Sequence, residues 1–574
     1  MIYKDCDLLC IGGGGAGVTA SVTASRKGAK VIIASKEPIG YGNTRIVGGV
    51  MAYGDLDGNK KGEDFFRDMV VGGGFLNNQE LVRVLVENAH EATFILESFG
   101  GVLGRDEEGR ISEKSLVQVG GHTSPRTLLI PSTGPGVGQA LRYAIFRENI
   151  ELLERTLITD LIQEGNRVFG AIGYEFKSGE LILIRAKKTI LATGGAGWVY
   201  YPHTDVTRAV TGDGYALALN SGAELIDMEQ VQFIPFSLTH PPGLVGIVVG
   251  EPFTAGPEGV ILNAQGKDIL PGVYLKTRAE VANAIILEVE KGNGTEYGGC
   301  LLDLKNNKKH PGGKILYEQF TKGIFKNFTD IVRYAYGSRA ASWDEPWDVY
   351  PSAHYFMGGV VIDVWGRVKG VENLFACGEV CGGIHGGNRL GSVSLMELFI
   401  LGKRVGECAT TELNEEIHNV DQELLDHYND KLRRMFGSRG KHRPVEVKRE
   451  LQKIMWDYIG PARTESKLKK GIELLSSIKE KAEDLHISNA KIYNTDVIDA
   501  IELGFMIPVS ISVAESALRR KESRGAHVRL DYPQRDDENW LKNIVIKKDM
   551  HDGLEVDLRP VQLKELKPPP QGGN

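Results

Sequence analysis

The 574-residue sequence has few cysteines, no long apolar run and no excess of positive charge. Its six cysteines are scattered without a CxxC pair, so we expect no metal site and no iron–sulfur cluster held by this chain alone. A net charge of -7 argues against nucleic acid as a partner. No apolar run reaches the roughly 18 residues that span a bilayer, and the N-terminus shows no basic region or cleavage site. We therefore predict a cytoplasmic protein without a membrane span of its own.

Glycine is abundant instead, with 71 residues that cluster in short segments. The segment "DLLCIGGGGAGVTASVTASRKGAKVIIAS" is typical of a strand, a glycine turn, a helix and a second strand, and Gly12, Gly14 and Gly17 satisfy the GxGxxG pattern. Glycines there let the backbone approach a pyrophosphate at the helix N-terminus, so we predict a nucleotide site. The second strand ends in Ser35 and Lys36, without the acid that usually binds an adenosine ribose, although Ser35 can hydrogen-bond a hydroxyl.

Two later segments repeat the order of strand, glycine and helix. "KKTILAT" runs into Gly194, and Asp213 in the following "TGDG" opens a helix that it can cap, or binds a ligand. The strand of "VENLFACGEV" ends at Glu379 and is followed by a glycine-rich loop and a helix that starts near Ser394. Three such segments directed at one ligand imply an extended ligand, and FAD fits this better than NAD.

These segments resemble the flavoproteins of the succinate dehydrogenase and fumarate reductase family, which includes L-aspartate oxidase and the adenylylsulfate reductase flavoprotein. The resemblance rests on "GGHTSPRT", "ILATGGAG", "TGDG", "DMEQVQF", "HYFMGG", "LFACGEV" and "HGGNRLG", and on "NTDVIDAIELGFM", "ESRGAH" and "DYP" near the C-terminus. It covers nearly the whole chain in the right order.

The resemblance implies an α/β fold in which a capping domain interrupts a Rossmann-like FAD-binding domain and a helical domain follows. We assign residues 1–240 and 346–410 to the FAD-binding domain and residues 241–345 to the cap. Residues 411–535 show helical periodicity with alternating charge, which indicates a helical C-terminal domain. The proline-rich end predicts that residues 536–574 form an extended tail.

The resemblance also implies which residues contact FAD. The expected positions are Gly12, Gly14, Gly15, Ala16, Gly17, Ser35, Lys36, Gly49, Gly194, Asp213, Glu379, Ser394 and Leu395. Membrane-bound members attach FAD through a histidine shortly after the second strand. Here "GYGNTRIVGG" places either Gly42 or Asn43 at that position, and neither is a nucleophile. We therefore predict noncovalent FAD.

Three cationic or titratable residues match the family's catalytic positions. Arg278 matches the proton donor, and His354 and Arg389 match the residues that contact the substrate carboxylate. Arginine suits this role because its fork binds a carboxylate with two hydrogen bonds. The implied reaction is hydride transfer between flavin and a C–C bond next to a carboxylate or acyl group. The chain has no cluster or haem motif, so we expect electrons to pass through an iron–sulfur subunit, which could also hold the protein at a membrane.

The stretch "VQFIPFS" departs from the family. Family members read approximately "QFHPT" here, and the histidine binds the second carboxylate of the substrate. In this chain Ile234 replaces that histidine and Phe236 replaces the threonine. A carboxylate against these side chains would be desolvated without a partner. We therefore interpret Ile234 and Phe236 as the wall of a substrate pocket that holds fumarate poorly and accepts one carboxylate or acyl end.

Other readings stay open at this point. A segment like "FIPF" also occurs in the adenylylsulfate reductase flavoprotein, although Arg389 is typical of the C–C enzymes. L-Aspartate oxidase is disfavoured by the missing histidine, and an electron-transfer or assembly protein by the presence of Arg278, His354 and Arg389 together. The sequence gives neither the substrate nor the direction of the reaction.

Overall fold

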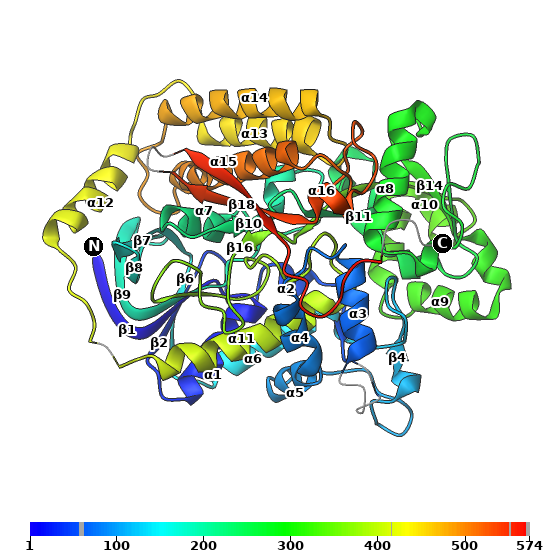
Figure 1. The fold of residues 1–574 in the computed structure, drawn as a ribbon, viewed down its shortest axis with the longest axis horizontal. Helices are drawn as coiled ribbons and strands as arrows, with labels where there is room; N and C mark the ends of the chain where they lie inside the picture. The colour runs from blue at the N-terminus through cyan, green and yellow to red at the C-terminus, as the bar shows by residue number, and fades with distance from the viewer. Residues whose placement is uncertain (55, 57–61, 415, 550–552, 570–574) are drawn as a thin grey trace.

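The computed structural model describes residues 1–54, 56, 62–414, 416–549 and 553–569, and it shows the expected α/β fold (Figure 1). A seven-stranded sheet has the order β6-β2-β1-β9-β8-β7, and β17 also pairs with β9. The pairs among β1, β2, β6, β9 and β17 are parallel, whereas β7 and β8 join antiparallel. The strands are β1 (Ile2–Ile11), β2 (Val31–Ser35), β6 (Ile150–Glu154), β7 (Thr156–Glu164), β8 (Arg167–Glu175), β9 (Glu180–Leu191) and β17 (Leu374–Ala376).

Helices pack closely on this sheet because small residues face one another. Helix α1 (Gly15–Arg26) lies along α11 (Val393–Thr411), as Figure 1 shows. A Cβ at Gly406 of α11 would lie 2.4 Å from the Ala20 carbonyl oxygen of α1, so only glycine permits this approach. The remaining elements of this part are α2 (Asn43–Ile46), β3 (Val50–Ala52), α3 (Glu63–Gly72), α4 (Gln79–Glu87), α5 (Glu91–Ser98), β4 (Leu116–Val117), β5 (Thr127–Leu129), α6 (Thr133–Phe146), α7 (Asp213–Asn220), β10 (Leu225–Ile226) and β16 (Gly359–Val360).

A second hydrophobic core lies in the part expected to form the cap. It runs from Phe236 to Val349 and includes the buried Phe320, Trp343 and Trp347. Around it lies a five-stranded sheet in the order β12-β11-β15-β14-β13. The chain leaves the first core along β11 and returns to it along β15, and these two long strands pair with each other. The elements are β11 (Val231–Leu238), β12 (Val248–Gly250), β13 (Val260–Leu262), α8 (Arg278–Glu288), β14 (Cys300–Asp303), α9 (Pro311–Thr321), α10 (Lys326–Ala341) and β15 (Trp347–Phe356).

Four helices follow as expected; in Figure 1 α13, α14 and α15 lie above the sheet, and α12 lies at its left. They are α12 (Gln422–Met435), α13 (Pro444–Ile459), α14 (Glu465–Glu483) and α15 (Thr495–Arg519). Helix α15 is long and apolar enough, by length and composition, to cross a membrane, and 67% of its apolar window is buried inside the protein. It is therefore the central helix of this part, packed between α7, α13 and α14.

The extended tail predicted for residues 536–574 is wrong for much of its length. After the short α16 (Asp537–Trp540), β18 (Lys542–Lys548) and β19 (Leu554–Pro560) form an antiparallel hairpin that joins β10 and β16 in a four-stranded sheet. Ile544 and Ile546 are fully buried there. The β-branched run Ile-Val-Ile in "KNIVIKK" carried this signal, and the prolines at the end of the chain obscured it.

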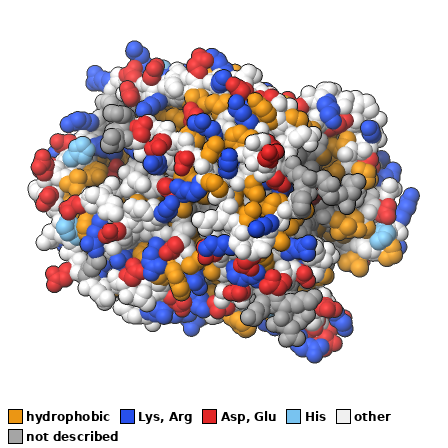
Figure 2. Space-filling model, viewed as in Figure 1, with side chains coloured by type: hydrophobic (Ala, Val, Ile, Leu, Met, Phe, Trp, Pro, Cys, Tyr) orange, Lys and Arg blue, Asp and Glu red, His pale blue; other side chains and the backbone are white. Residues whose placement is uncertain are grey.

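The outer surface mixes the two signs of charge. Figure 2 shows basic and acidic side chains interleaved over this face, with apolar side chains between them. All six cysteines are buried as free thiols. Within the described ranges, no group of three or more His, Cys, Asp or Glu side chains is placed to hold a metal ion.

Candidate active site

One cleft brings the three glycine-rich segments together. Its lining includes the turn from Gly12 to Ala16, the end of β2, the start of α7 and the start of α11. With its open mouth it encloses about 1740 Å³ of empty space. Of the predicted cofactor residues, those that line the cleft are Gly12, Gly14, Gly15, Ala16, Ser35, Lys36, Gly194, Asp213, Glu379, Ser394 and Leu395.

The glycine turn is shaped to receive an anionic group. Gly12 has a φ of +116°, and a Cβ there would lie 2.2 Å from the Ala192 carbonyl oxygen. Helix α1 begins at Gly15, after the N-cap Gly14, with no acidic residue in its first turn. The positive end of the helix dipole therefore faces the cleft, and the Gly15 N–H there donates to the Thr44 hydroxyl at 3.1 Å. This geometry fits the pyrophosphate of FAD.

Gly17 and Gly49, also predicted to contact FAD, are not among the lining residues. A Cβ at Gly17 would lie 2.0 Å from the Gly12 carbonyl oxygen, so this glycine lets α1 pack against the turn. Gly49 has a φ of +80°, and a Cβ there would lie 2.8 Å from the Ile130 carbonyl oxygen. Its neighbours Gly48 and Val50 line the cleft. Both glycines therefore shape the cofactor cleft from behind its wall.

Lys36 lies where the ribose-binding acid was expected. Its ammonium group is 2.9 Å from Asp213 and 3.0 Å from Glu502 of α15, and it donates to Thr211. Burial acts to lower the pKa of Lys36, but the two carboxylates outweigh it and raise the pKa. Glu502 in turn pairs with Lys448 of α13. The helical domain thus holds a charged residue of the cofactor cleft in place.

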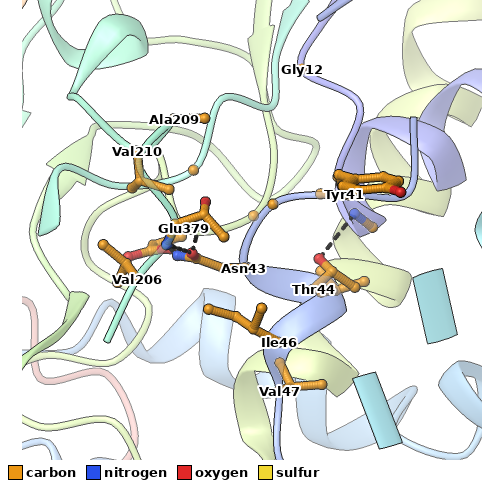
Figure 3. A pocket seen from close by; sticks show the side chains of 18 of the residues that line it. Gly12, Tyr41, Asn43, Thr44, Ile46, Val47, Val206, Ala209, Val210 and Glu379 are labelled. Carbon is orange, nitrogen blue, oxygen red and sulfur yellow. Dashed lines mark hydrogen bonds between the residues drawn. The ribbon is translucent and has the colours of Figure 1, made fainter. Parts of the chain in front are cut away.

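Glu379 and Asn43 face each other across the cleft (Figure 3). The Asn43 amide donates to Glu379 at 3.4 Å, and the Phe356 N–H donates to the same carboxyl group at 3.1 Å. Burial raises the pKa of Glu379 to about 7. Asn43 also accepts a hydrogen bond from the Thr207 N–H at 3.0 Å, so its side chain is fixed at both ends. Of the two positions predicted for flavin attachment, Asn43 therefore carries an unreactive, already bonded amide, and Gly42 has no side chain.

The predicted catalytic residues converge at the end of the cleft next to the cap. Arg278 is the first residue of α8, which Thr277 and Glu280 cap reciprocally. Its Nε donates to Glu251 at 2.7 Å, and a second nitrogen of the guanidinium group also bonds to this carboxylate. Glu251 lines the cleft, whereas Arg278 is buried behind it. Burial acts to raise the pKa of Glu251, but Arg278 overcomes this and holds the pKa below its usual value.

Gln232 of β11 connects the two arginines. It accepts a hydrogen bond from Arg278 at 3.1 Å and donates to the Arg389 carbonyl oxygen at 2.8 Å. The Arg389 side chain lies over the ring of Tyr355, with the guanidinium carbon 4.7 Å from the ring centre. Tyr355 lines the cleft, so Arg389 lies one side chain away from it.

Arg389 is a buried cation without a carboxylate bonded to it among the described residues. One of its terminal nitrogens donates to the Ser394 hydroxyl at 3.1 Å and to the Leu390 carbonyl oxygen at 3.4 Å, and its Nε is buried without a hydrogen-bond partner. Burial, reinforced by the charge of Arg278, lowers the pKa of Arg389 to about 9. An unpaired buried charge is unfavourable, so this arrangement favours an anion beside Arg389.

His354 lines the cleft and is oriented from behind. Its Nδ1 lies 2.7 Å from the Asp205 carboxylate, which fixes the ring and directs Nε2 away from this acid. Burial lowers the pKa of His354, and the charges of Arg278 and Arg389 lower it further. Asp205 acts in the opposite direction without reversing the shift. A bound carboxylate would reverse this effect, since it would stabilise the imidazolium.

The two predicted wall residues lie in different places. Ile234 lines the cleft, whereas Phe236 is fully buried in the second hydrophobic core and is not a lining residue. The pairing register of β11 with β15 shifts between Ile234 and Ser237, which breaks the strict alternation of side chains and turns Phe236 into the cap. Of the two predicted wall residues, Ile234 therefore lines the cleft and Phe236 does not.

Sequence reasoning missed the two acids that pair with the predicted catalytic residues. Glu251 lies 27 positions from Arg278, and Asp205 lies 149 positions from His354. Nothing in the local sequence joins either pair. Glu251 is brought near β11 by the pairing of Gly250 with Phe236, and Asp205 is brought to His354 by the bridge between Thr204 and Ala353.

Comparison with known proteins agrees with this geometry. Residues 7–395 match the family described as FAD binding domain, and residues 448–573 match the family described as fumarate reductase flavoprotein C-term. A fumarate reductase (CoM/CoB) subunit of Methanothermobacter marburgensis is 36% identical over 95% of this chain and 98% of its own length. The succinate dehydrogenase flavoprotein subunit of Coxiella burnetii is 31% identical over 98% of this chain and 97% of its own.

The same likeness holds in three dimensions. A variant of the quinol fumarate reductase FrdA of E. coli superimposes with a TM-score of 0.89 at 29% identity, covering 99% of both chains. The glycine turns that fit a dinucleotide and the matched family models agree on FAD as the cofactor. The chain therefore belongs to the fumarate reductase and succinate dehydrogenase flavoprotein family of FAD-dependent oxidoreductases.

Proposed function

We propose that this enzyme transfers a hydride between FAD and a C–C bond next to a single carboxylate or acyl group, in a pocket altered from that for fumarate and succinate. One observation carries the proposal. Among the described residues, the buried guanidinium of Arg389 has no acid bonded to it, whereas Arg278 is paired with Glu251. The same cleft that Glu251 lines also presents the apolar Ile234. The site therefore has a place for one anionic end and an apolar place for the other.

Each residue of the site has its own part in this reaction. Bound FAD supplies or accepts the hydride. Arg389 and His354 hold the carboxylate and draw negative charge onto it, which activates an adjacent C=C bond. Arg278 holds the proton that the carbon receives, and Glu251, bonded to two nitrogens of Arg278, is placed to return that proton. Asp205 positions His354, and Gln232 positions both arginines.

Substitution of Arg278 tests the assignment. Arg278→Lys keeps the positive charge but removes the guanidinium group that makes two hydrogen bonds to Glu251. Turnover of C–C substrates should therefore fall by about 100-fold or more, which is the rate factor that general acid catalysis typically contributes. Reduction of the bound flavin by dithionite should be unchanged. A neighbouring exposed residue of the same helix supplies the matched control, Glu280→Gln, which should retain turnover. Unchanged turnover in Arg278→Lys would remove Arg278 from its role.

The acceptor is tested directly by anaerobic reoxidation. The flavin is reduced chemically, and fumarate, short 2-enoates, enoyl thioesters and adenylylsulfate are added in parallel while flavin absorbance is followed. Recovery with an enoate or enoyl thioester supports the proposal. Recovery with adenylylsulfate alone would assign the chain to sulfur chemistry, and fast recovery with fumarate would show that another residue holds a second carboxylate.

Noncovalent FAD and an iron–sulfur partner complete the proposal. The bonded amide of Asn43 supports noncovalent binding, because no nucleophile occupies this position. Acid precipitation should release the flavin into the supernatant, and flavin in the pellet would contradict it. Several relatives are named as subunits, which supports a partner that delivers electrons to a cytoplasmic flavoprotein. Copurification of an iron–sulfur protein would test this.

A further inference from the structure

The cap side of the cleft carries an aromatic wall. Phe253, Phe325 and Phe328 line the cleft together with Ile234 and Val248. The rings of Phe325 and Phe328 are parallel within 4° at 5.9 Å, and Phe253 meets Phe325 edge-on at 6.0 Å. Phe253 follows Glu251 by two residues, so this wall begins next to the Arg278–Glu251 pair. It is a surface suited to a flat apolar group.

The hydroxyl groups near this wall are already bonded. Thr254 donates to the Glu251 carbonyl oxygen and accepts from the Glu251 N–H, both at 2.8 Å. The Ser237 hydroxyl bonds to the Ser352 hydroxyl at 2.6 Å. Gly250 offers no side chain, and a Cβ there would lie 2.8 Å from the Thr254 hydroxyl. The described part of this wall thus supplies no free donor for a second carboxylate.

The charges near the reaction site lead to the same conclusion. Glu251 neutralises Arg278, and Asp205 pairs with His354. Arg389 remains as the cation to which no carboxylate is bonded among the described residues. When His354 is protonated, as a bound carboxylate favours, one anionic group of a substrate balances this set. A second would lie unpaired against phenyl rings, which is strongly unfavourable.

We propose that the substrate is a 2-enoate with one carboxylate and an aromatic or long apolar substituent at its β carbon, bound against Phe253, Phe325 and Phe328. This inference rests on the proposed function and names its substrate class. The C=C bond takes up a hydride at the β carbon and a proton at the α carbon and becomes a saturated acid. Its two electrons come from the reduced cofactor, which dithionite recharges in the assay.

Binding of the saturated acids tests the inference without turnover. Butanoate, 3-phenylpropanoate and succinate are titrated calorimetrically into the oxidised holoenzyme. We expect 3-phenylpropanoate to bind on the order of 10- to 100-fold more tightly than butanoate, because a phenyl group buries several more carbons. Succinate should bind more weakly than butanoate. Succinate as the tightest ligand, or equal affinity for butanoate and 3-phenylpropanoate, would overturn the inference.

Variants of the aromatic wall test which residues cause the preference for 3-phenylpropanoate. Phe253→Leu and Phe328→Leu should each reduce the preference for 3-phenylpropanoate over butanoate by about 3- to 10-fold, since each removes one aromatic contact. Phe320→Leu is the matched control, because Phe320 packs against Phe325 and Phe328 but does not line the cleft. An equal loss in Phe320→Leu would mean that core packing sets the preference, and the wall assignment would fail.

Turnover separates this inference from the function on which it rests. Dithionite-reduced holoenzyme is mixed with acrylate, crotonate, cinnamate or fumarate, and flavin reoxidation is followed. Fastest reoxidation by cinnamate supports both proposals. Faster reoxidation by acrylate or crotonate than by cinnamate overturns the aromatic pocket and leaves the proposed function standing. Reoxidation by none of the four contradicts both.

Discussion

Removing the charge of Arg389 should make the enzyme more stable and inactive at once. In the folded protein the pKa of Arg389 is lowered from 12.5 to about 9, with burial as the main cause and Arg278 next. At about 1.4 kcal/mol per pH unit, the protonated guanidinium opposes folding by about 5 kcal/mol. Arg389→Met keeps the length of the side chain and much of its contact with the Tyr355 ring. We expect a net rise of about 1–4 kcal/mol in the free energy of unfolding at pH 7, after the lost hydrogen bonds are counted.

The sign of the pH dependence follows from the same shift. Above about pH 9 the folded wild type releases the Arg389 proton while the unfolded chain keeps it, so the wild type gains stability relative to the variant as pH rises further. Thermal unfolding midpoints of the two holoenzymes, measured at one scan rate between pH 7 and pH 10, should therefore approach each other. Arg404→Met is the control, because Arg404 lies over Trp365 and donates to the Val364 carbonyl oxygen. It should not stabilise the protein.

The same unfolding experiment, repeated with a carboxylate ligand, tests whether the charge of Arg389 serves to bind an anion. A saturated monocarboxylate such as butanoate should raise the unfolding midpoint of the wild type and leave that of Arg389→Met unchanged. An Arg389→Met protein that is less stable than the wild type at pH 7 without ligand would refute the reasoning. It would mean that the guanidinium is already satisfied inside the fold and that no anion is required beside it.

Three further changes test other parts of the site. Ile234→His should lower the Kd of succinate by about 10- to 100-fold, because a charge-assisted hydrogen bond contributes about 1.5–3 kcal/mol. The control Ile234→Leu should leave this Kd unchanged. An unchanged Kd in Ile234→His would show that residue 234 does not face the second carboxylate. Asp205→Asn removes the charge that raises the pKa of His354. Because butanoate binding strengthens as His354 is protonated, the variant should bind butanoate only at a lower pH than the wild type does. Coincident pH profiles of butanoate affinity in the two proteins would exclude this linkage. Glu502→Gln removes one of the two carboxylates at Lys36, so less FAD should stay bound during gel filtration. The measurement is the ratio of flavin absorbance to protein absorbance. The control Glu473→Gln, at an exposed residue, should retain FAD.

The sequence predicted the cofactor site well because its signals are local. A GxGxxG turn requires a strand before it and a helix after it, and all three lie within the first 26 residues. The pairs Glu251–Arg278 and Asp205–His354 depend on distant segments that meet only in the folded chain, so no periodicity reveals them. The placement of Phe236 failed for a related reason. A register shift in β11 is a property of two paired strands, and a single strand sequence does not show it.

Strand β11 separates the chemistry of the enzyme from its choice of substrate. Gln232 on this strand bonds to Arg278 and to the Arg389 backbone, and so it holds the two arginines to which we assign the proton donor and the carboxylate site. Two residues later Ile234 faces the cleft, where the proposed function places the part of the substrate beyond its double bond. A change at Ile234 can therefore alter the substrate without disturbing the arginines, because no hydrogen bond of the catalytic set passes through its side chain. Membership of the chain in the fumarate reductase and succinate dehydrogenase family is therefore compatible with the altered substrate pocket that we propose.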